Sequence, residues 1–172
     1  VSRNSLSDLL EYYEDAYLLF SVPEFTRSLA NNARSASKVY AVDPAMFGAF
    51  SPASAFDQGQ RLETAVFNAL RRRTPAVRVG SVCRLLVKEK NKSHEVDFVA
   101  GDALLMQAYS LTQVSVDMAS EKTREREIAA LDASMAQFDL GESVIVTMDE
   151  QADIPCEHGV VHAVPAWKWL LA

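Results

Sequence analysis

The sequence predicts an α/β domain over residues 57–172, in which helices flank a single sheet. Segments with alternating apolar residues, typical of strands, are separated by segments with apolar residues at three- and four-residue steps, typical of helices. Their order is one helix, three strands, a second helix, two strands and a short helix, which is an α/β order. With 172 residues, 49% of them hydrophobic, the chain is long enough to bury a core.

Each element has its own signal. The first helix is expected in DQGQRLETAVFNALRRR, where Leu62, Val66 and Leu70 share one stripe and Asp57 can cap the start. Gly141 ends the second helix, SEKTREREIAALDASMAQFDLG, and Pro165 begins the last one, PAWKWLLA. The expected strands are VCRLLVKE, HEVDFVA, LTQVSV, SVIVTMD and VVHAVP.

The N-terminal residues predict a smaller unit. SLSDLLEYYEDAYLLFSV is expected to form an amphipathic helix that passes into a strand ended by Pro23, and FTRSLANNARSASKVYAVD a hairpin with a polar turn. A short helix is expected near residues 45–50, and helix, hairpin and helix together suggest the end of a winged-helix segment. SPASAFDQG is rich in Ser, Pro and Gly, so we expect a winged-helix-like segment at residues 1–50, a linker at 51–60 and the α/β domain at 57–172.

Two acidic residues alternate with apolar ones in HEVDFVA. Side chains at positions i and i+2 of a strand share a face, so Glu95 and Asp97 are expected to point one way while Val96 and Phe98 enter the core. Paired carboxylates on one face can hold a divalent cation. The alternative is that they form the wet face of an antiparallel sheet.

The next strand, LTQVSV, carries Gln113 and Ser115 at the same spacing. If the two strands pair, these side chains meet Glu95 and Asp97, and Glu63 from the preceding helix can reach the same place. Oxygen ligands of this kind suit Mg²⁺ or Mn²⁺, which can activate water and neutralise charge on a phosphodiester.

Charge and composition argue against several classes of protein. A net charge of −6 argues against a protein that coats nucleic acid through its overall field. No apolar run is long enough to cross a bilayer, and the N-terminus lacks a signal-peptide pattern, so a cytoplasmic location without a membrane partner is expected. Cys83 and Cys156 lack metal or redox spacing and are expected to be reduced thiols; Cys156 lies near His158, but two ligands alone do not make a metal site.

Several segments, taken in order, resemble the C-terminal region of prokaryotic AAA-family ATPases: LLEYYEDAYLLFSVPEF, SKVYAVDPAMFGAF, GQRLETAVFNALRRR, HEVDFV, LTQVSVDM, TREREIAAL, VIVTMDE and VPAWKWLL. In that family a P-loop ATPase core is followed by a winged-helix segment and a domain of unknown function with the PD-(D/E)XK nuclease-like fold. The resemblance spans nearly the whole chain and implies that fold here. The P-loop pattern is absent and position 1 is Val, so ATP binding is expected only in an upstream portion.

The resemblance also implies site residues. Glu63 matches the helical acid of the nuclease-like fold, Asp97 the strand acid, and Gln113 the position of a second acid or a glutamine. Ser115 stands where an active member has its lysine, which helps to position the attacking water. These residues therefore imply a degenerate catalytic site that binds Mg²⁺ or Mn²⁺ weakly. Three lysines lie near enough along the chain to be a relocated catalytic lysine: Lys88, Lys90 and Lys92.

Three functions follow as alternatives. The expected one is a non-catalytic accessory domain for binding or assembly, whose partner is the upstream ATPase domain of the same chain and which does not cleave DNA or RNA. The second is a divalent-metal-dependent nuclease with a relocated lysine. The third is a DNA-binding module in which Arg27, Arg34 and Lys38 on the hairpin contact phosphates, although the neighbouring helix, SDLLEYYEDAY, is acidic.

Overall fold

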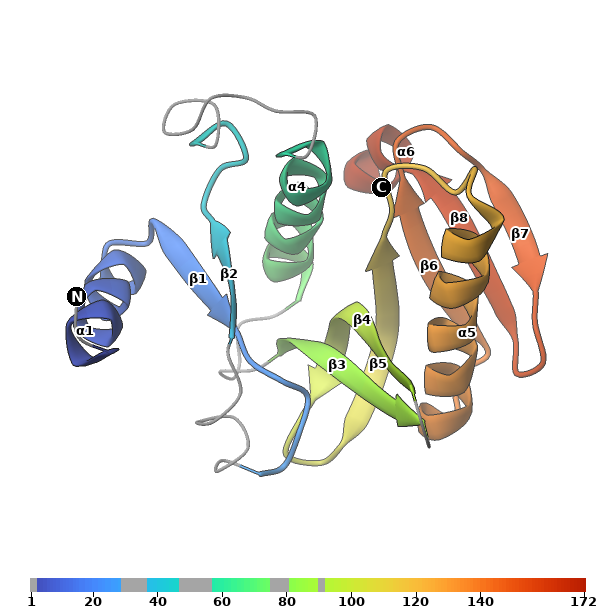
Figure 1. Cartoon of the computed structure of the whole chain (residues 1–172), viewed down its shortest axis with the longest axis horizontal. Coiled ribbons are helices and arrows are strands. Elements are labelled where there is room, and N and C mark those ends of the chain that lie inside the picture. The colour runs from blue at the N-terminus through green and yellow to red at the C-terminus, as the bar shows by residue number, and fades with distance from the viewer. Residues whose placement is uncertain (1–2, 29–36, 47–56, 75–80, 90–91) are drawn as a thin grey trace.

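The computed structural model describes residues 3–28, 37–46, 57–74, 81–89 and 92–172 (Figure 1). Along these residues the elements are α1 (Arg3–Asp15), β1 (Leu19–Val22), β2 (Lys38–Ala41), α4 (Asp57–Arg73), β3 (Val82–Glu89), β4 (Lys92–Asp102), β5 (Gln107–Val114), α5 (Glu121–Phe138), β6 (Glu142–Thr147), β7 (Ala152–Pro155), β8 (Val160–Pro165) and α6 (Ala166–Leu171).

Six strands form one mixed sheet in the order β3-β4-β5-β6-β8-β7. The pairs β3·β4, β4·β5 and β7·β8 are antiparallel, whereas β5·β6 and β6·β8 are parallel. The predicted α/β class and the pairing of the HEVDFVA strand with the LTQVSV strand are therefore confirmed. None of the described helices combines the length and apolar character needed to span a bilayer.

Helices cover both faces of this sheet. On one face, Leu131 and Met135 of α5 pack against Val96 and Val99 of β4. On the other face, α4 and α6 share a second core with apolar residues of β4 and β6. The expected apolar stripe of α4 is buried, at Leu62, Val66 and Leu70.

A β-bulge changes the direction of the side chains on β4. Because Leu85 pairs with Val96 and Cys83 pairs with Val99, two residues of β4, Asp97 and Phe98, lie opposite a single residue of β3. Val96 consequently packs in the α5 core and Phe98 in the α4 core. The prediction that Val96 and Phe98 share one core face is wrong, since strict alternation ends at the bulge.

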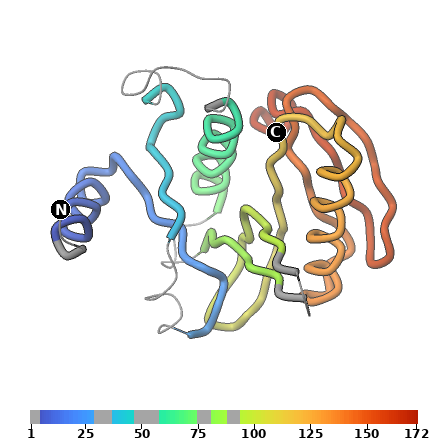
Figure 2. Tube along the Cα trace, viewed as in Figure 1, coloured from blue at the N-terminus to red at the C-terminus, as the bar shows by residue number. Residues whose placement is uncertain are grey.

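The N-terminal hairpin packs into the same core as the α/β domain. Strands β1 and β2 are antiparallel and lie beside α4 (Figures 1 and 2). Val22 and Tyr40 are buried, and the Tyr40 ring lies 4.7 Å from the ring of Phe67 and 5.4 Å from that of Phe98. The predicted segment 1–50 thus contributes to the core of the predicted domain 57–172.

The details of the N-terminal predictions differ from the structure. The first strand of the hairpin is β1, and the residues that follow it run along β3: Arg84 N–H donates to Pro23 O at 2.9 Å and Phe25 N–H to Arg84 O at 2.8 Å. This covers one outer edge of the sheet. Residues 57–60 of the predicted linker form the first turn of α4. The rest of that linker and most of the predicted helix at 45–50 lie outside the described residues.

Candidate functional site

Asp97 and Gln113 lie where β4 and β5 separate. The β4·β5 ladder runs from Asp102 and Gln107 to Phe98 and Thr112. Beyond this point side chains replace the ladder: Asp97 N–H donates to Gln113 Oε1 at 3.0 Å, and Val114 N–H donates to Asp97 Oδ2 at 3.0 Å. Both side chains are buried and fixed, so the two predicted site residues meet.

Lys38 from β2 lies among the predicted acidic residues. Its Nζ atom is 2.9 Å from Glu63 Oε1, 2.9 Å from Asp97 Oδ1 and 3.2 Å from Glu95 Oε1. Arg84 contributes a second positive charge, with Nη1 at 3.6 Å from Glu95 Oε1. Three carboxylates from α4 and β4 therefore surround one ammonium group supplied by the N-terminal hairpin.

The surroundings of Lys38 hold it in the charged form. Burial acts to lower its pKa, but the negative charges of Asp97 and Glu63 outweigh burial and raise the pKa well above its ordinary value. Tyr40, two residues further along β2, donates its hydroxyl to Glu63 Oε1 at 2.6 Å. Burial and the Glu63 charge raise the pKa of Tyr40 as well, so this hydroxyl stays a donor.

For Asp97, burial outweighs the attraction of the neighbouring positive charge. Burial and the neighbouring Glu63 charge raise the pKa of Asp97 to about 6, although Lys38 and the Val114 N–H favour the ionised form. The carboxyl group therefore changes its charge just below neutral pH. This is a perturbed titration of the kind that accumulates at functional sites.

A pocket of about 320 Å³ opens next to Asp97. On its α5 side, Glu127 accepts a hydrogen bond from Gln113 Nε2 at 2.7 Å and forms an ion pair with Arg126. The amide of Gln113 is thus fixed by partners at both ends. The residues that line the pocket are His94, Glu95, Asp97, Gln113, Arg126, Glu127 and Ala130.

A site for Mg²⁺ or Mn²⁺ needs ligand oxygens that are free to coordinate the ion. The Oε1 atom of Glu63 and both oxygens of Asp97 already accept hydrogen bonds, and Gln113 Oε1 accepts one from the backbone. A cation that approaches Glu63 and Asp97 together meets the ammonium group of Lys38. These residues therefore do not fit a divalent ion while Lys38 is in place.

Other predicted site residues lie elsewhere. Ser115 follows the end of β5 and donates its hydroxyl to Asp117 O at 2.8 Å. Arg27 donates to Leu105 O at 2.9 Å, and Arg34 lies outside the described residues. The three lysines considered as relocated catalytic groups lie on or next to the β3–β4 hairpin, with Lys90 and the side chains of the other two outside the described residues: Lys88, Lys90 and Lys92.

Sequence reasoning considered Lys38 only as a phosphate contact and missed its place among the carboxylates. One available signal was the alternation in KVYA, because Lys38 and Tyr40 share a strand face and an inward Tyr40 brings Lys38 with it. Arg126 and Glu127 of the pocket were also missed. They lie in the regular helix TREREIAAL, where nothing distinguishes them from solvent-exposed charges.

Comparison with known proteins shows a similarity to an archaeal protein. No protein family model matches the chain, and no solved structure matches it. The chain is 31% identical, over 177 aligned residues, to an uncharacterized protein of Methanocaldococcus jannaschii. The alignment covers 99% of this chain and 37% of that protein, so the chain spans little more than a third of the length of the relative that it matches.

Proposed function

We propose that this chain is a non-catalytic accessory domain of an AAA-type ATPase, with a nuclease-like scaffold retained for binding or assembly. One observation carries the non-catalytic part: Lys38 Nζ lies 2.9 Å from both Glu63 Oε1 and Asp97 Oδ1, in the place where a divalent cation would bridge these acids. An ammonium group there neutralises the carboxylates without offering a coordination position for water.

The nuclease-like part of the proposal rests on the arrangement of the acids. A helix, three antiparallel-paired strands, a second helix and a parallel strand precede the C-terminal hairpin, and the acids come from the helix and the middle strand of this unit. The convergence of Glu63 on α4 with Asp97 on β4, and the contact of Gln113 with Asp97, support this part of the proposal. The winged-helix assignment of the N-terminal segment stays a proposal based on sequence resemblance.

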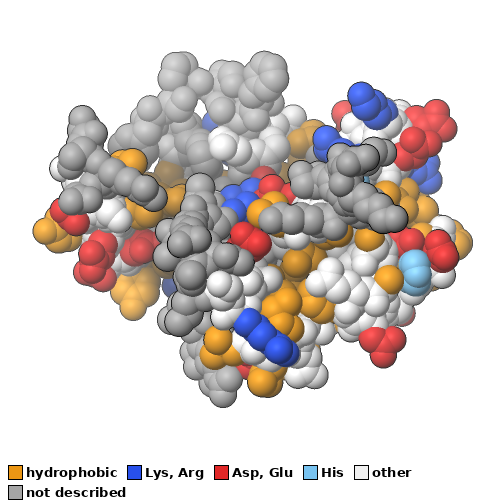
Figure 3. All heavy atoms as spheres, turned by 60° about the horizontal axis from the view of Figure 1, so that its bottom comes forward, with side chains coloured by type: hydrophobic (Ala, Val, Ile, Leu, Met, Phe, Trp, Pro, Cys, Tyr) orange, Lys and Arg blue, Asp and Glu red, His pale blue; other side chains and the backbone are white. Residues whose placement is uncertain are grey.

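An exposed apolar face on α1 supports a role in assembly. Leu6, Leu9, Tyr12 and Tyr13 of this helix are between 41% and 69% exposed. Figure 3 shows apolar side chains mixed with acidic ones at the left of the molecule, over α1. An apolar helix face open to solvent is typical of a contact surface. The partner that we propose is the ATPase portion of the same protein.

The second candidate is a nuclease in which Lys38 is the relocated lysine. The observation that favours it is the same short distance from Lys38 to Asp97, together with the pocket beside Asp97. In this reading the ammonium group would move toward a bound phosphate and position the attacking water. The two candidates therefore assign opposite roles to one side chain.

Mn²⁺ binding and cleavage, measured together, separate the two candidates. The purified chain, a Lys38→Met variant and a Lys38→Met/Asp97→Asn double variant are titrated with Mn²⁺ and incubated with linear, supercoiled and single-stranded DNA and with RNA. The accessory role predicts that wild type cleaves nothing and that its Glu63 and Asp97 do not hold Mn²⁺. It also predicts that Lys38→Met binds Mn²⁺ more tightly, because the carboxylates lose their competing cation, and that the double variant loses this gain.

The nuclease role predicts a different pattern. Wild type would cleave at least one substrate with Mn²⁺ or Mg²⁺, and Lys38→Met would lose about a hundredfold to a thousandfold in rate, as expected when one preorganised charge is removed. Cleavage by wild type that disappears in an Asp97→Asn single variant would overturn the accessory role.

A further inference from the structure

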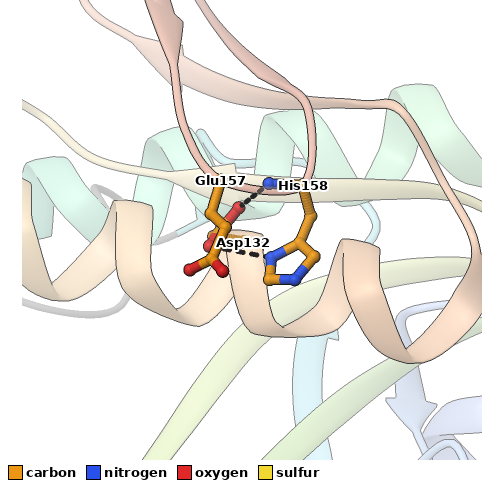
Figure 4. A group of neighbouring side chains, drawn as sticks. All are labelled: Asp132, Glu157 and His158. Atoms are coloured by element: carbon orange, nitrogen blue, oxygen red, sulfur yellow. Dashed lines mark hydrogen bonds and ion pairs between the residues drawn. The ribbon is translucent and has the colours of Figure 1, made fainter.

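A second group of ligand-type side chains lies apart from the site of Lys38 and Asp97. The tight turn between β7 and β8 has the sequence CEHG, and it packs against α5. Asp132 of α5 faces the turn, and Glu157 and His158 of the turn point toward it (Figure 4). One donor atom from each of these three residues lies within 4.8 Å of those of the other two.

Cys156 lies next to these three donors. Its thiol donates to Gly159 O at 3.2 Å and lies beside the Asp132 carboxylate, with which it can also form a hydrogen bond. Asp132 also accepts hydrogen bonds from His158: the backbone N–H is 2.8 Å from Oδ1, and ring Nδ1 is 3.1 Å from Oδ2. Two carboxylates and one imidazole thus converge within 4.8 Å of one another, and the thiol of Cys156 lies beside Asp132.

The backbone fixes this turn before any ligand binds. Cys156 N–H donates to Gly159 O at 2.9 Å, and Val160 N–H donates to Gly141 O at 3.0 Å. Gly159 lies so close to Gly141 that a Cβ atom at Gly159 would be 2.2 Å from Gly141 O. The turn is therefore held against the segment that follows α5, which keeps Cys156 and His158 facing Asp132.

From this arrangement we propose that Asp132, Cys156, Glu157 and His158 form a binding site for a transition-metal ion of the Zn²⁺ class. A set of one sulfur, one nitrogen and two oxygen donors selects Zn²⁺ over Mg²⁺ or Ca²⁺, which bind oxygen alone. Donors bound tetrahedrally to Zn²⁺ at about 2.0–2.3 Å are about 3.3–3.8 Å apart. The three donors found within 4.8 Å of one another need only a small closure, which rotation of exposed Glu157 can supply, and the Cys156 thiol reaches the ion by turning away from Gly159 O.

A purely structural role explains less of the arrangement. The hydrogen bonds between Asp132 and His158 would fasten the turn to α5 by themselves, and they need neither a thiol nor a second carboxylate. The same hairpin contains a simple pair of this kind, because His162 Nδ1 lies 2.7 Å from Asp153 Oδ1 on the neighbouring strand. His162 is therefore a matched control for His158.

Cobalt titration tests the site directly. The whole chain, reduced and freed of metal with a chelator, is titrated with Co²⁺, which reports thiolate ligation by a charge-transfer band and tetrahedral geometry by its visible bands. We expect one equivalent to give both signals and Zn²⁺ to displace Co²⁺. Cys156→Ser should abolish the charge-transfer band, and His158→Ala should weaken binding by about a hundredfold, at least the loss typical of residues that merely support a ligand. His162→Ala should bind Co²⁺ like wild type.

Two outcomes of the cobalt titration would contradict the metal site. A wild-type titration without a charge-transfer band, or His158→Ala and Glu157→Gln variants that bind Co²⁺ as tightly as wild type, would overturn the proposal. Thermal unfolding of the metal-free variants shows whether they are folded. Because Glu157 is exposed, Glu157→Gln should have the same metal-free melting temperature as wild type. Zn²⁺ should raise the melting temperature of wild type and His162→Ala but not that of His158→Ala.

Discussion

Replacing Lys38 with methionine keeps the approximate length of the side chain and removes its charge. In the wild type this charge lies 2.9 Å from Glu63, 2.9 Å from Asp97 and 3.2 Å from Glu95. Without it, three carboxylates that converge from α4 and β4 repel one another across a partly buried space. The variant therefore measures how much the ammonium group stabilises the fold.

The structure sets the size of the effect. Removing one partner from a buried ion pair costs about 3–5 kcal/mol, because the remaining charge is left uncompensated. The Lys38 side chain is 30% exposed, so water can replace part of its role. We therefore expect Lys38→Met to lower the free energy of unfolding at pH 8 by about 2–3 kcal/mol, at or below the lower end of that range.

Asp97 makes this loss depend on pH. Burial and Glu63 raise its pKa in the folded state to about 6, above the ordinary value of 3.8. The folded state consequently binds the extra proton between these two values, and this group makes the wild type more stable as the pH falls from 6 toward 4. Loss of Lys38 raises the Asp97 pKa further, so the carboxyl is neutral at pH 5 and needs no cation. We expect the loss caused by Lys38→Met at pH 5 to be about half of that at pH 8.

Urea unfolding at pH 8 and pH 5 provides the measurement. Tryptophan fluorescence reports the transition, because Trp169 of α6 packs against the core that contains Tyr40. Lys122→Met, at an exposed position of α5, is the matched control and should change stability by less than about 0.5 kcal/mol. A Lys38→Met loss no larger than this control, or one that is equal at the two pH values, would refute the reasoning.

Three further predictions follow from single contacts. Gln113→Glu places a carboxylate where the amide now donates to Glu127 at 2.7 Å, so urea unfolding at pH 8 should show a loss of about 2 kcal/mol or more; unchanged stability would contradict this contact. Gly159→Ala brings Cβ to 2.2 Å from Gly141 O and should cost about 1–3 kcal/mol, seen as a lower melting temperature, whereas an unchanged one would exclude the close approach. Burial raises the pKa of Cys83 to about 12 and also raises that of Cys156, but Cys83 is buried and Cys156 only half-buried. A thiol reagent at pH 8 should therefore label Cys156 before Cys83 in the native chain and both together in urea, and equal native labelling rates would disprove it.

The fold class could be predicted because the core signals are local. The alternation in HEVDFVA and LTQVSV and the helical stripe of ALDASMAQF are contained within single elements, which was enough to predict the strands and the helix. Burial follows the helical stripe, since Ala130, Leu131 and Met135 are buried, but it does not alternate along the strands, because Asp97, Gln113 and Ser115 are buried as well. The meeting of Asp97 with Gln113 was also accessible, since it required only that consecutive strands pair. The bulge at Asp97 and Phe98 was not accessible, because it depends on the register between β3 and β4, and no residue type marks it.

The role of Lys38 could not be read from the sequence for a different reason. Its ion pair with Asp97 joins residues 59 positions apart, and the packing of the hairpin on α4 decides that distance. The lysines that the sequence offered as relocated catalytic groups are Lys88, Lys90 and Lys92, whereas the structure brings Lys38 of the N-terminal hairpin next to Asp97. Charged residues give no periodic signal of their own, so only the buried Tyr40 beside Lys38 indicated which way it points.

The shared core of the N-terminal hairpin and α4 affects how this protein can be dissected. A shortened chain that starts at Asp57 would keep Glu63 and Asp97 but lose Lys38 and Tyr40. Such a fragment would uncover aromatic rings of α4 and β4 and leave its acids without their ammonium partner, a combination that favours aggregation and adventitious metal binding. A metal affinity measured on this fragment would result from the loss of Lys38 and would not apply to the longer chain. Fragments for biochemical work should therefore begin before β1.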